Sequence, residues 1–151
     1  MSFFNSMQVS ASGLTAQRLR MDVIAENMAN VNTTRTADGG PYRRRTALFE
    51  QMQDVTPFST HFNNLVNRAP QQGSQGRGVR VSRIAVDNAP GAQVYDPAHP
   101  DANAAGYVTM PNVNTVMEMV NMISASRSYE ANVTAMNTVR GMMSRTLDIG
   151  R

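Results

Sequence analysis

Two long stretches of the sequence, one at each end, carry hydrophobic residues at the spacing of an α-helix. Residues 111–150 contain one interior glycine and no proline after the first residue, so we predict a single helix of roughly 35 residues, about 50 Å long. A proline before the start and a glycine at the end are typical of helix boundaries. Thr115 and Glu118 have the spacing of a capping box, although Asn112 or Asn114 can serve as the N-cap instead.

The hydrophobic positions of this C-terminal helix form two faces rather than one. The first face carries Val113, Val116, Val120 and Ile123, and the second carries Met122, Ala125, Tyr129, Met136, Val139 and Met143. A helix with two apolar faces needs at least two neighbours, and the chain offers one other long helix. We therefore expect one face to contact another protein, for which the many methionines provide an adaptable surface. The alternative is an ordinary buried helix in which methionine fills gaps.

The second long helix is predicted at residues 2–30. A heptad seam runs along it over about four repeats, with one interruption at Arg18: Phe4, Met7, Ala11, Leu14, Arg18, Met21, Ala25 and Met28. Small residues around Gly13 allow another backbone to approach closely. We expect the seam to pack on one face of the C-terminal helix of the same chain. After Asn30, Asn and Thr residues favour turns and end the helix.

The middle of the chain predicts short strands between these helices. Alternating patterns indicate strands at residues 42–52 and 79–86, and two shorter strands at residues 93–95 and 106–109. Residues 54–78, rich in Asn, Gln, Gly, Ser and Pro, predict a flexible loop. The fold class is therefore α+β, with a small β-rich region and a flexible loop inserted between two terminal helices.

Composition narrows the class of protein. A chain of 151 residues can form a core, but 41% hydrophobic content and the absence of Trp indicate a modest core and an extended shape. All 14 basic residues are Arg, and their dispersion gives little indication of nucleic-acid binding. The absence of Cys excludes disulfides and thiolate metal sites. With no signal peptide or apolar run of membrane length, we expect a cytosolic chain unless export uses no cleaved signal.

Two groups of charged residues suggest possible chemistry. Asp96, His99 and Asp101 can bind a metal or act as a base, but neighbouring prolines and the turn preference of Asp favour a turn. The basic triplet at residues 43–45 beside Tyr42 suggests nucleic-acid binding, but three charges are few. A solvated strand face or intersubunit ion pairs explain the triplet better. No phosphate-binding loop or nucleophile elbow is present, so we predict no enzyme activity, no cofactor and no metal.

Several motifs resemble one family of proteins. The segment SASGLTAQRLRMDVIAENMANVNTT is similar to the helix of flagellar rod, hook and related axial proteins, which leads to an N-x-A-N motif, here Asn27, Ala29 and Asn30. Three further stretches narrow the resemblance to the proximal-rod members: DGGPYRRRTALFE, YDPAHPDANAAGYVTMPNVN and EMVNMISASRSYEANVTAMNTVRGMMSRTLDIG. The resemblance covers both termini and most of the middle, and its clearest departure is at residues 54–78.

The resemblance implies a structural subunit that polymerises into the hollow proximal rod of the bacterial flagellar basal body. Such a rod is a drive shaft that transmits torque and encloses the export channel. The family's terminal helices, here residues 1–32 and 111–151, pair as an antiparallel coiled coil, and residues 33–110 would be the inserted β-rich region. Export through the flagellar type III apparatus without a cleaved signal would place the chain in the rod, within the periplasmic space. The implied partners are other copies of the chain, the rod proteins FlgB, FlgF and FlgG, and the FliE adaptor near the rotor ring.

We expect the assembly interface to lie at or near the helical seams, at Leu14, Asn27, Asn30, Met119, Ile123, Arg127, Tyr129, Asn132 and Met136. The three asparagines are unusual for a core and can fix the register of paired helices by hydrogen bonding across them. Asn30 has an alternative role, because Asn also suits a helix end. Two other protein classes stay open from the residues alone. One is a soluble helical adaptor or chaperone-like protein that binds a single partner, and the other is a hydrolase built around His99.

Overall fold

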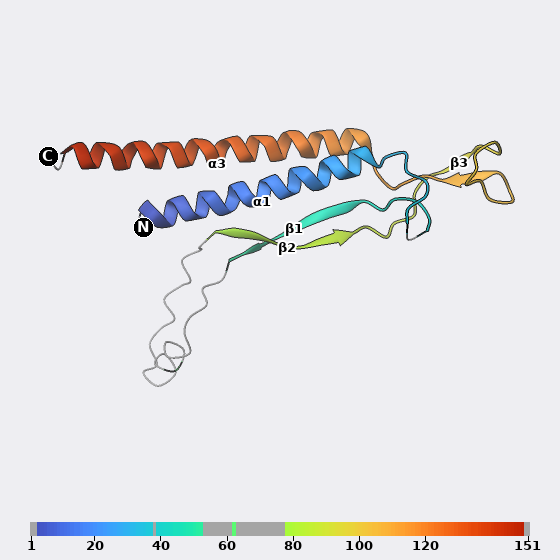
Figure 1. Ribbon diagram of the computed structural model, residues 1–151, viewed down its shortest axis with the longest axis horizontal. Helices are drawn as coiled ribbons and strands as arrows, with labels where there is room; N and C mark the ends of the chain where they lie inside the picture. Colours follow the sequence, from blue (N-terminus) through green and yellow to red (C-terminus); the bar gives the residue numbers. More distant parts are fainter. Residues whose placement is uncertain (1–2, 38, 53–61, 63–77, 150–151) are drawn as a thin grey trace.

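The computed structural model describes residues 3–37, 39–52, 62 and 78–149 of the chain. Its main elements are two long helices, α1 (Phe3–Ala29) and α3 (Thr115–Ile149). They pack side by side in opposite directions and give the molecule an elongated outline (Figure 1). Both predicted terminal helices are therefore confirmed. Among the described residues, no helix is long and apolar enough to cross a membrane.

The start of α3 is determined by Asn114. Its Oδ1 accepts a hydrogen bond from the backbone N–H of Met117 at 3.1 Å, which satisfies one of the free donors of the first turn. Asn114 is thus the N-cap, as one of the two sequence alternatives proposed. The capping box with Thr115 is wrong, because the side chain of Glu118 lies in the interior of the molecule instead.

The four predicted strands form two separate antiparallel pairs. β1 (Arg45–Gln51) pairs with β2 (Val79–Val86), and β3 (Gln93–Tyr95) pairs with β4 (Tyr107–Thr109). β1 begins later than predicted, because the N–H of Arg44 donates to Oδ1 of Asn112 at 2.8 Å rather than to a strand. The flexible loop predicted at residues 54–78 lies almost entirely outside the described residues.

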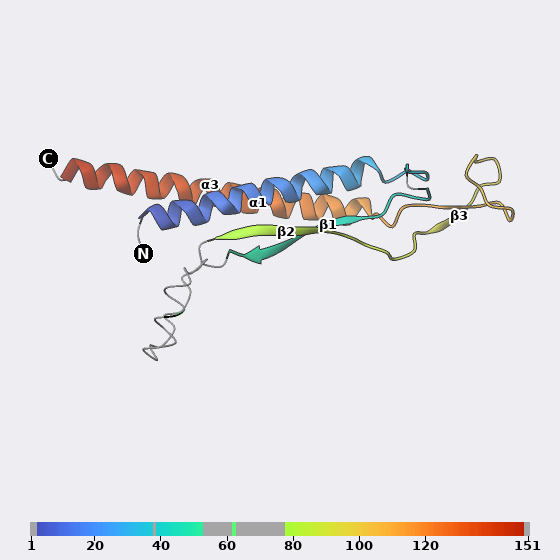
Figure 2. The same cartoon turned by 60° about the horizontal axis from the view of Figure 1, so that its bottom comes forward.

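The helices and the first strand pair lie side by side, each running along the long axis of the molecule (Figure 1). α1 contacts α3 on one side and the β1–β2 hairpin on the other (Figures 1 and 2). The β3–β4 hairpin projects beyond the end of the helix pair. It is tied to the loop after α1 by the Thr34 hydroxyl, which donates to Oδ2 of Asp101 at 2.8 Å. The sequence suggested one β-rich region, but the structure contains two hairpins that do not pair with each other.

The residues of α1 that face inward differ from the predicted heptad seam. Half of the seam is exposed, namely Phe4, Ala11, Arg18 and Ala25, and the other half is only half-buried. The buried positions of α1 lie beside the seam and are mostly small: Ser10, Gly13, Ala16, Val23, Ile24 and Asn27. The predicted seam therefore lies on the wrong face of α1. The physical reason is that α1 has two neighbours, and the small residues allow both to approach closely.

Candidate assembly surface and the buried joint beneath it

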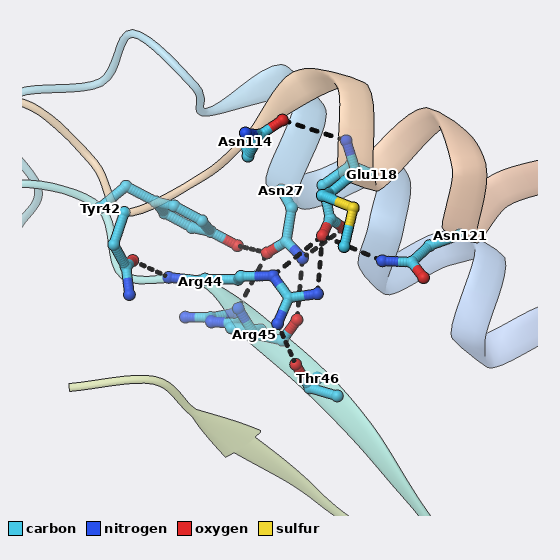
Figure 3. Close-up of polar contacts among 10 residues, drawn as sticks. Asn27, Tyr42, Arg44, Arg45, Thr46, Asn114, Glu118 and Asn121 are labelled. Atoms are coloured by element: carbon cyan, nitrogen blue, oxygen red, sulfur yellow. Dashed lines mark hydrogen bonds and ion pairs between the residues drawn. The ribbon is translucent and has the colours of Figure 1, made fainter. Parts of the chain in front are cut away.

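A group of polar side chains joins α1, β1 and α3 close to the end of α1 (Figure 3). We call this group the polar joint: Asn27, Tyr42, Arg44, Arg45, Glu118 and Asn121. Asn27 comes from the last turns of α1, and Glu118 comes from the first turn of α3. The two side chains are completely buried, with 0% relative exposure. Buried polar groups of this kind destabilise a fold unless they are hydrogen-bonded.

Asn27 uses the full hydrogen-bonding capacity of its side chain. Oδ1 accepts from the Tyr42 hydroxyl at 3.0 Å and from the Arg45 N–H at 2.9 Å. Nδ2 donates to the Arg45 carbonyl at 2.8 Å and to Oε2 of Glu118 at 3.1 Å. The amide thus exchanges two hydrogen bonds with the backbone of Arg45, as a neighbouring strand would. Asn27 therefore provides hydrogen-bond partners for the backbone N–H and carbonyl of Arg45, on the free edge of β1 where that strand begins.

Glu118 is the charged centre of the polar joint. Its Oε1 accepts from Nε and Nη2 of Arg44, at 2.9 and 2.7 Å, and from Nδ2 of Asn121 at 3.4 Å. Its Oε2 accepts from Asn27. Desolvating a carboxylate costs several kcal/mol, so a buried glutamate requires a close cation and further hydrogen bonds. The joint can form only when α1, β1 and α3 are all in place, because each of them supplies part of this set.

Tyr42 completes the polar joint on the side of α1. Burial raises the pKa of its phenol above the ordinary value of 10.0. The carboxylates of Glu26 and Glu118 act in the same direction, and the Arg45 guanidinium opposes them. This guanidinium lies 5.8 Å from the centre of the Tyr42 ring and pairs with Glu26 at 2.7 Å. At neutral pH the phenol therefore keeps the proton that it donates to Asn27.

A second close contact between the two helices lies at Gly13. A Cβ atom on Gly13 would lie 2.9 Å from Oδ1 of Asn132, closer than such atoms normally approach. The element that comes close to Gly13 is therefore α3, through the side chain of Asn132 rather than through the backbone that the sequence led us to expect. Nδ2 of Asn132 donates to the Ser128 carbonyl of its own helix at 2.8 Å, so its hydrogen bond does not cross to α1.

The side of α3 that faces away from α1 is apolar near the start of the helix. We call it the outer face, and its five residues are between 49% and 70% exposed: Val116, Met117, Met119, Val120 and Ile123. The residues predicted for the opposite face are buried or half-buried: Met122, Ala125, Tyr129, Met136, Val139 and Met143. The prediction of two apolar faces is thus confirmed, except that Val113 lies before the start of α3 and is half-buried. The ordinary buried helix is excluded, since only one face is covered in the described part of the chain.

The residues predicted at the assembly interface fall into two groups. Three are exposed on α3: Met119, Ile123 and Arg127. The other six are buried or half-buried within the subunit: Leu14, Asn27, Asn30, Tyr129, Asn132 and Met136. Among these, Asn30 serves the end of α1, because its Nδ2 donates to the Glu26 carbonyl at 2.9 Å and its Oδ1 accepts from Thr33 at 3.1 Å.

Sequence reasoning missed the role of Glu118. A signal was available, because Glu118 continues the spacing of Met122, Ala125 and Tyr129 on the α1-facing side of α3. An acidic residue within an apolar stripe indicates a buried charge that needs a cation. That cation is Arg44, the central residue of the basic triplet.

The basic triplet acts within the subunit. Arg44 pairs with Glu118, and Arg45 pairs with Glu26. Arg43 donates to Oδ1 of Asn88 at 2.9 Å. The counterions of Arg44 and Arg45 thus lie on the helices of the same chain, and intersubunit ion pairs stay a prediction.

The segment around His99 forms a series of turns. The N–H of Asp101 donates to Nδ1 of His99 at 3.1 Å, and the N–H of Ala98 donates to Oδ1 of Asp96 at 3.2 Å. Asp101 also accepts the hydrogen bond from Thr34 that anchors the β3–β4 hairpin. Nowhere in the described ranges do three His, Asp or Glu side chains converge as a metal site would require. The turn interpretation accounts for these contacts.

Comparison with known proteins finds relatives over the whole chain. Residues 7–35 match the family model "Flagella basal body rod protein", and residues 104–149 match "Flagellar basal body rod FlgEFG protein C-terminal". The flagellar basal-body rod protein FlgC of Bacillus subtilis (strain 168) is 46% identical over 155 residues, which cover 100% of both chains. FlgC of Borreliella burgdorferi is 47% identical over 158 residues, with 99% and 98% covered. FlgC of Escherichia coli O157:H7 is 42% identical over 151 residues, with 100% of both covered.

Proposed function

The chain belongs to the FlgC family of flagellar basal-body rod proteins, and on this premise we propose that it is a structural subunit of the proximal rod. It is not an enzyme. It assembles with other components of the flagellar basal body into a hollow drive shaft that transmits torque and encloses the export channel. The alternative of a soluble adaptor is not favoured, since the full-length relatives are rod proteins.

The outer face of α3 is the observation that carries this proposal. Its five apolar side chains lie within about two turns of a helix whose other face is already occupied by α1. Burying such side chains stabilises an association by roughly 25 cal/mol per Å² of apolar surface. A neighbouring subunit that covers this face with a different surface of its own makes a head-to-tail contact, which builds a filament rather than a closed dimer.

We infer that the terminal helices form the inner layer of the rod. In this arrangement residues 1–32 and 111–151 pair as an antiparallel coiled coil, and residues 33–110 form the outer part of the subunit. The antiparallel packing of α1 on α3 supports this division. Met119, Ile123 and Arg127 contact neighbouring subunits, while the buried members of the predicted set hold the helix pair together. A surface that is completed only by neighbours also favours final ordering of the helices during assembly.

We also infer the partners and the location from the family. The partners are other copies of the chain, the rod proteins FlgB, FlgF and FlgG, the FliE adaptor near the rotor ring, and the flagellar type III export apparatus. The rod lies within the periplasmic space, and the chain reaches it without a cleaved signal peptide. No nucleic acid and no direct membrane span is part of this proposal.

Substitution on the outer face tests the proposal. The variant Val120→Asp/Ile123→Asp places two charges on exposed positions, so the purified subunit should keep its helical circular dichroism. In a strain that lacks the wild-type chain, this variant should be absent from isolated basal bodies, and the cells should not swim. A matched control is Asn137→Asp, at an exposed polar position of α3, which should assemble and support swimming. Normal swimming with the double variant would refute the role of the outer face.

The same experiment separates a rod subunit from an adaptor. A rod subunit should be recovered in purified basal bodies in many copies. An adaptor would stay in the soluble fraction and elute with a single partner in a complex of fixed stoichiometry. Recovery only in such a complex would overturn the proposed function.

A further inference from the structure

We propose that two contacts lock the axial register of α1 against α3, and that the segment leading into β1 controls one of them. The contacts are the Asn27–Glu118 hydrogen bond and the packing of Asn132 on Gly13. Together we call them the register lock. The inference stands on the geometry of one subunit, so it does not depend on the proposed rod function.

The spacing of the two contacts is the same on both helices. Asn27 follows Gly13 by fourteen residues on α1, and Asn132 follows Glu118 by fourteen residues on α3. Because each residue adds about 1.5 Å, the contacts are separated by about 21 Å along either helix. The helices therefore run in step between the contacts, and both contacts are satisfied by one register.

Apolar packing alone would not select this register. A shift of seven residues returns nearly the same faces of two helices to contact, so hydrophobic matching changes little. Such a shift places Asn27 opposite Ala125 in one direction and opposite Pro111 in the other. Neither residue offers a side-chain acceptor to Nδ2 of Asn27, and Glu118 loses the same hydrogen bond. With α1 and the segment leading into β1 held together, Nδ2 of Asn27 would keep only the Arg45 carbonyl, and Glu118 would lose both Asn27 and Arg44, which disfavours both shifted registers.

Gly13 excludes the same shifts by its lack of a side chain. Its backbone leaves room for the amide of Asn132, where even a Cβ atom would crowd Oδ1. A shift of seven residues would place Asn132 opposite Ser6 or Arg20, each of which has a larger side chain. The first contact thus acts through hydrogen bonding, and the second acts through shape.

The segment leading into β1 supplies the groups that make the first contact possible. Tyr42 and the backbone of Arg45 hold the amide of Asn27, and the guanidinium of Arg44 neutralises Glu118. Without them, the buried Asn27 and Glu118 would each keep only part of their hydrogen bonds. The helices can therefore adopt this register stably only after the inserted region has folded onto them. The lock couples the folding of the middle of the chain to the pairing of its ends.

A fixed register also determines how far the end of α3 extends past the start of α1. In the locked register the end of α3 extends past the start of α1 (Figure 1). This extension carries Leu147, whose side chain is 71% exposed. A shift of seven residues would change the length of the extension by about 10 Å.

The experiment uses the fact that the sequence contains no cysteine, so that pairs of introduced cysteines report the register. The in-register pair is Gln17→Cys/Ser128→Cys, in which each position is four residues from the Gly13–Asn132 contact. The shifted pair is Gln17→Cys/Ala135→Cys, displaced by seven residues on α3. Both full-length proteins are treated with a short bifunctional maleimide, as purified chains and in isolated basal bodies. The in-register pair should cross-link, and the shifted pair should cross-link roughly tenfold less.

The lock is then removed by Asn27→Leu/Glu118→Leu together with Asn132→Ala, which takes away both contacts and keeps apolar packing between the helices. In this background, the yield of the shifted pair should rise roughly tenfold relative to the unaltered lock. Equal yields from the two pairs with the lock intact would overturn the proposal. So would an unchanged preference for the in-register pair after the lock is removed.

A second variant covers the case in which the leucine variant loses its helical circular dichroism. Gly13→Ala should lower the in-register yield, because the new Cβ crowds Asn132. Adding Asn132→Ala should restore the yield by removing the crowded amide. If Gly13→Ala has no effect, or if the second substitution does not restore the yield, the lock does not exist at this contact and the proposal fails.

Discussion

Nδ2 of Asn27 donates a hydrogen bond to Oε2 of Glu118 at 3.1 Å, although the two residues are 91 positions apart in the sequence. Both side chains are fully buried. The bond joins the end of α1 to the start of α3, at the place where the inserted region leaves the helix pair and returns to it. The same two residues also hold the start of β1 through Arg44 and Arg45. One polar contact thus determines how the three parts of the chain meet.

Removing the charge of Glu118 should destabilise the subunit. We expect Glu118→Gln to lower the free energy of unfolding by about 2 kcal/mol, because the half-buried Arg44 loses its counterion. Urea denaturation of the purified chain, followed by circular dichroism, measures this change. The control is Glu130→Gln on the exposed side of α3, which should change the value by less than about 0.5 kcal/mol. Equal effects of the two substitutions would contradict a central role for Glu118.

The N-cap of α3 can be tested by a pair of neighbouring substitutions. Asn114→Ala should lower the free energy of unfolding by about 1 kcal/mol, because the N–H of Met117 loses its acceptor. Thr115→Ala should cause no comparable loss, since Thr115 is not the cap. Thermal unfolding of both variants checks the difference. A larger loss of unfolding free energy in Thr115→Ala than in Asn114→Ala would show that Thr115 is the N-cap, contrary to the structure.

The phenol of Tyr42 should make the stability of the subunit sensitive to alkaline pH. Its pKa is higher in the folded chain than in the unfolded chain, so above about pH 10 the folded chain binds more protons. The stability that the protonated phenol contributes is therefore fully present below the pKa that Tyr42 has in the unfolded chain. It is lost as pH rises through the pKa that Tyr42 has in the folded chain. Tyr42→Phe should flatten this alkaline decrease, measured as the urea midpoint against pH.

The control for the alkaline experiment is Tyr95→Phe, because the Tyr95 side chain is 64% exposed. This variant should retain the alkaline decrease of the parent chain. Tyr42→Phe also loses the hydrogen bond to Asn27, so a loss of about 1 kcal/mol is expected at pH values where the parent phenol is protonated. An alkaline decrease of the same size in both variants would show that Tyr42 does not cause it.

Local pattern was sufficient to predict the secondary structure of this protein. The two helices and the four strands depend on residues close to one another in the sequence, whereas the cap at Asn114 was one of three that the sequence allowed. The outer face of α3 was also predictable, because helical spacing alone places Val116, Val120 and Ile123 together. These features follow from backbone geometry and side-chain periodicity, which act over a few residues.

The face of α1 that is buried against its neighbours was not predictable in the same way. The methionine-rich heptad seam favoured Ala11 and Ala25 as inward positions, yet both are exposed. α1 packs against a hairpin as well as against α3, and Gly13 lets α3 approach along a different line. Which face of an amphipathic helix is buried depends on all of its neighbours, and their positions are tertiary information.

The sequence by itself determined the elements of this protein, the two apolar faces of α3 and the family to which the chain is related. Only the tertiary structure decided the role of Glu118, which by local rules belongs to a capping box. Its partner Arg44 is 74 positions away and becomes a neighbour only after β1 has packed beside α1. A charge is buried where a distant cation and distant donors offset its desolvation, and no local pattern contains that pairing.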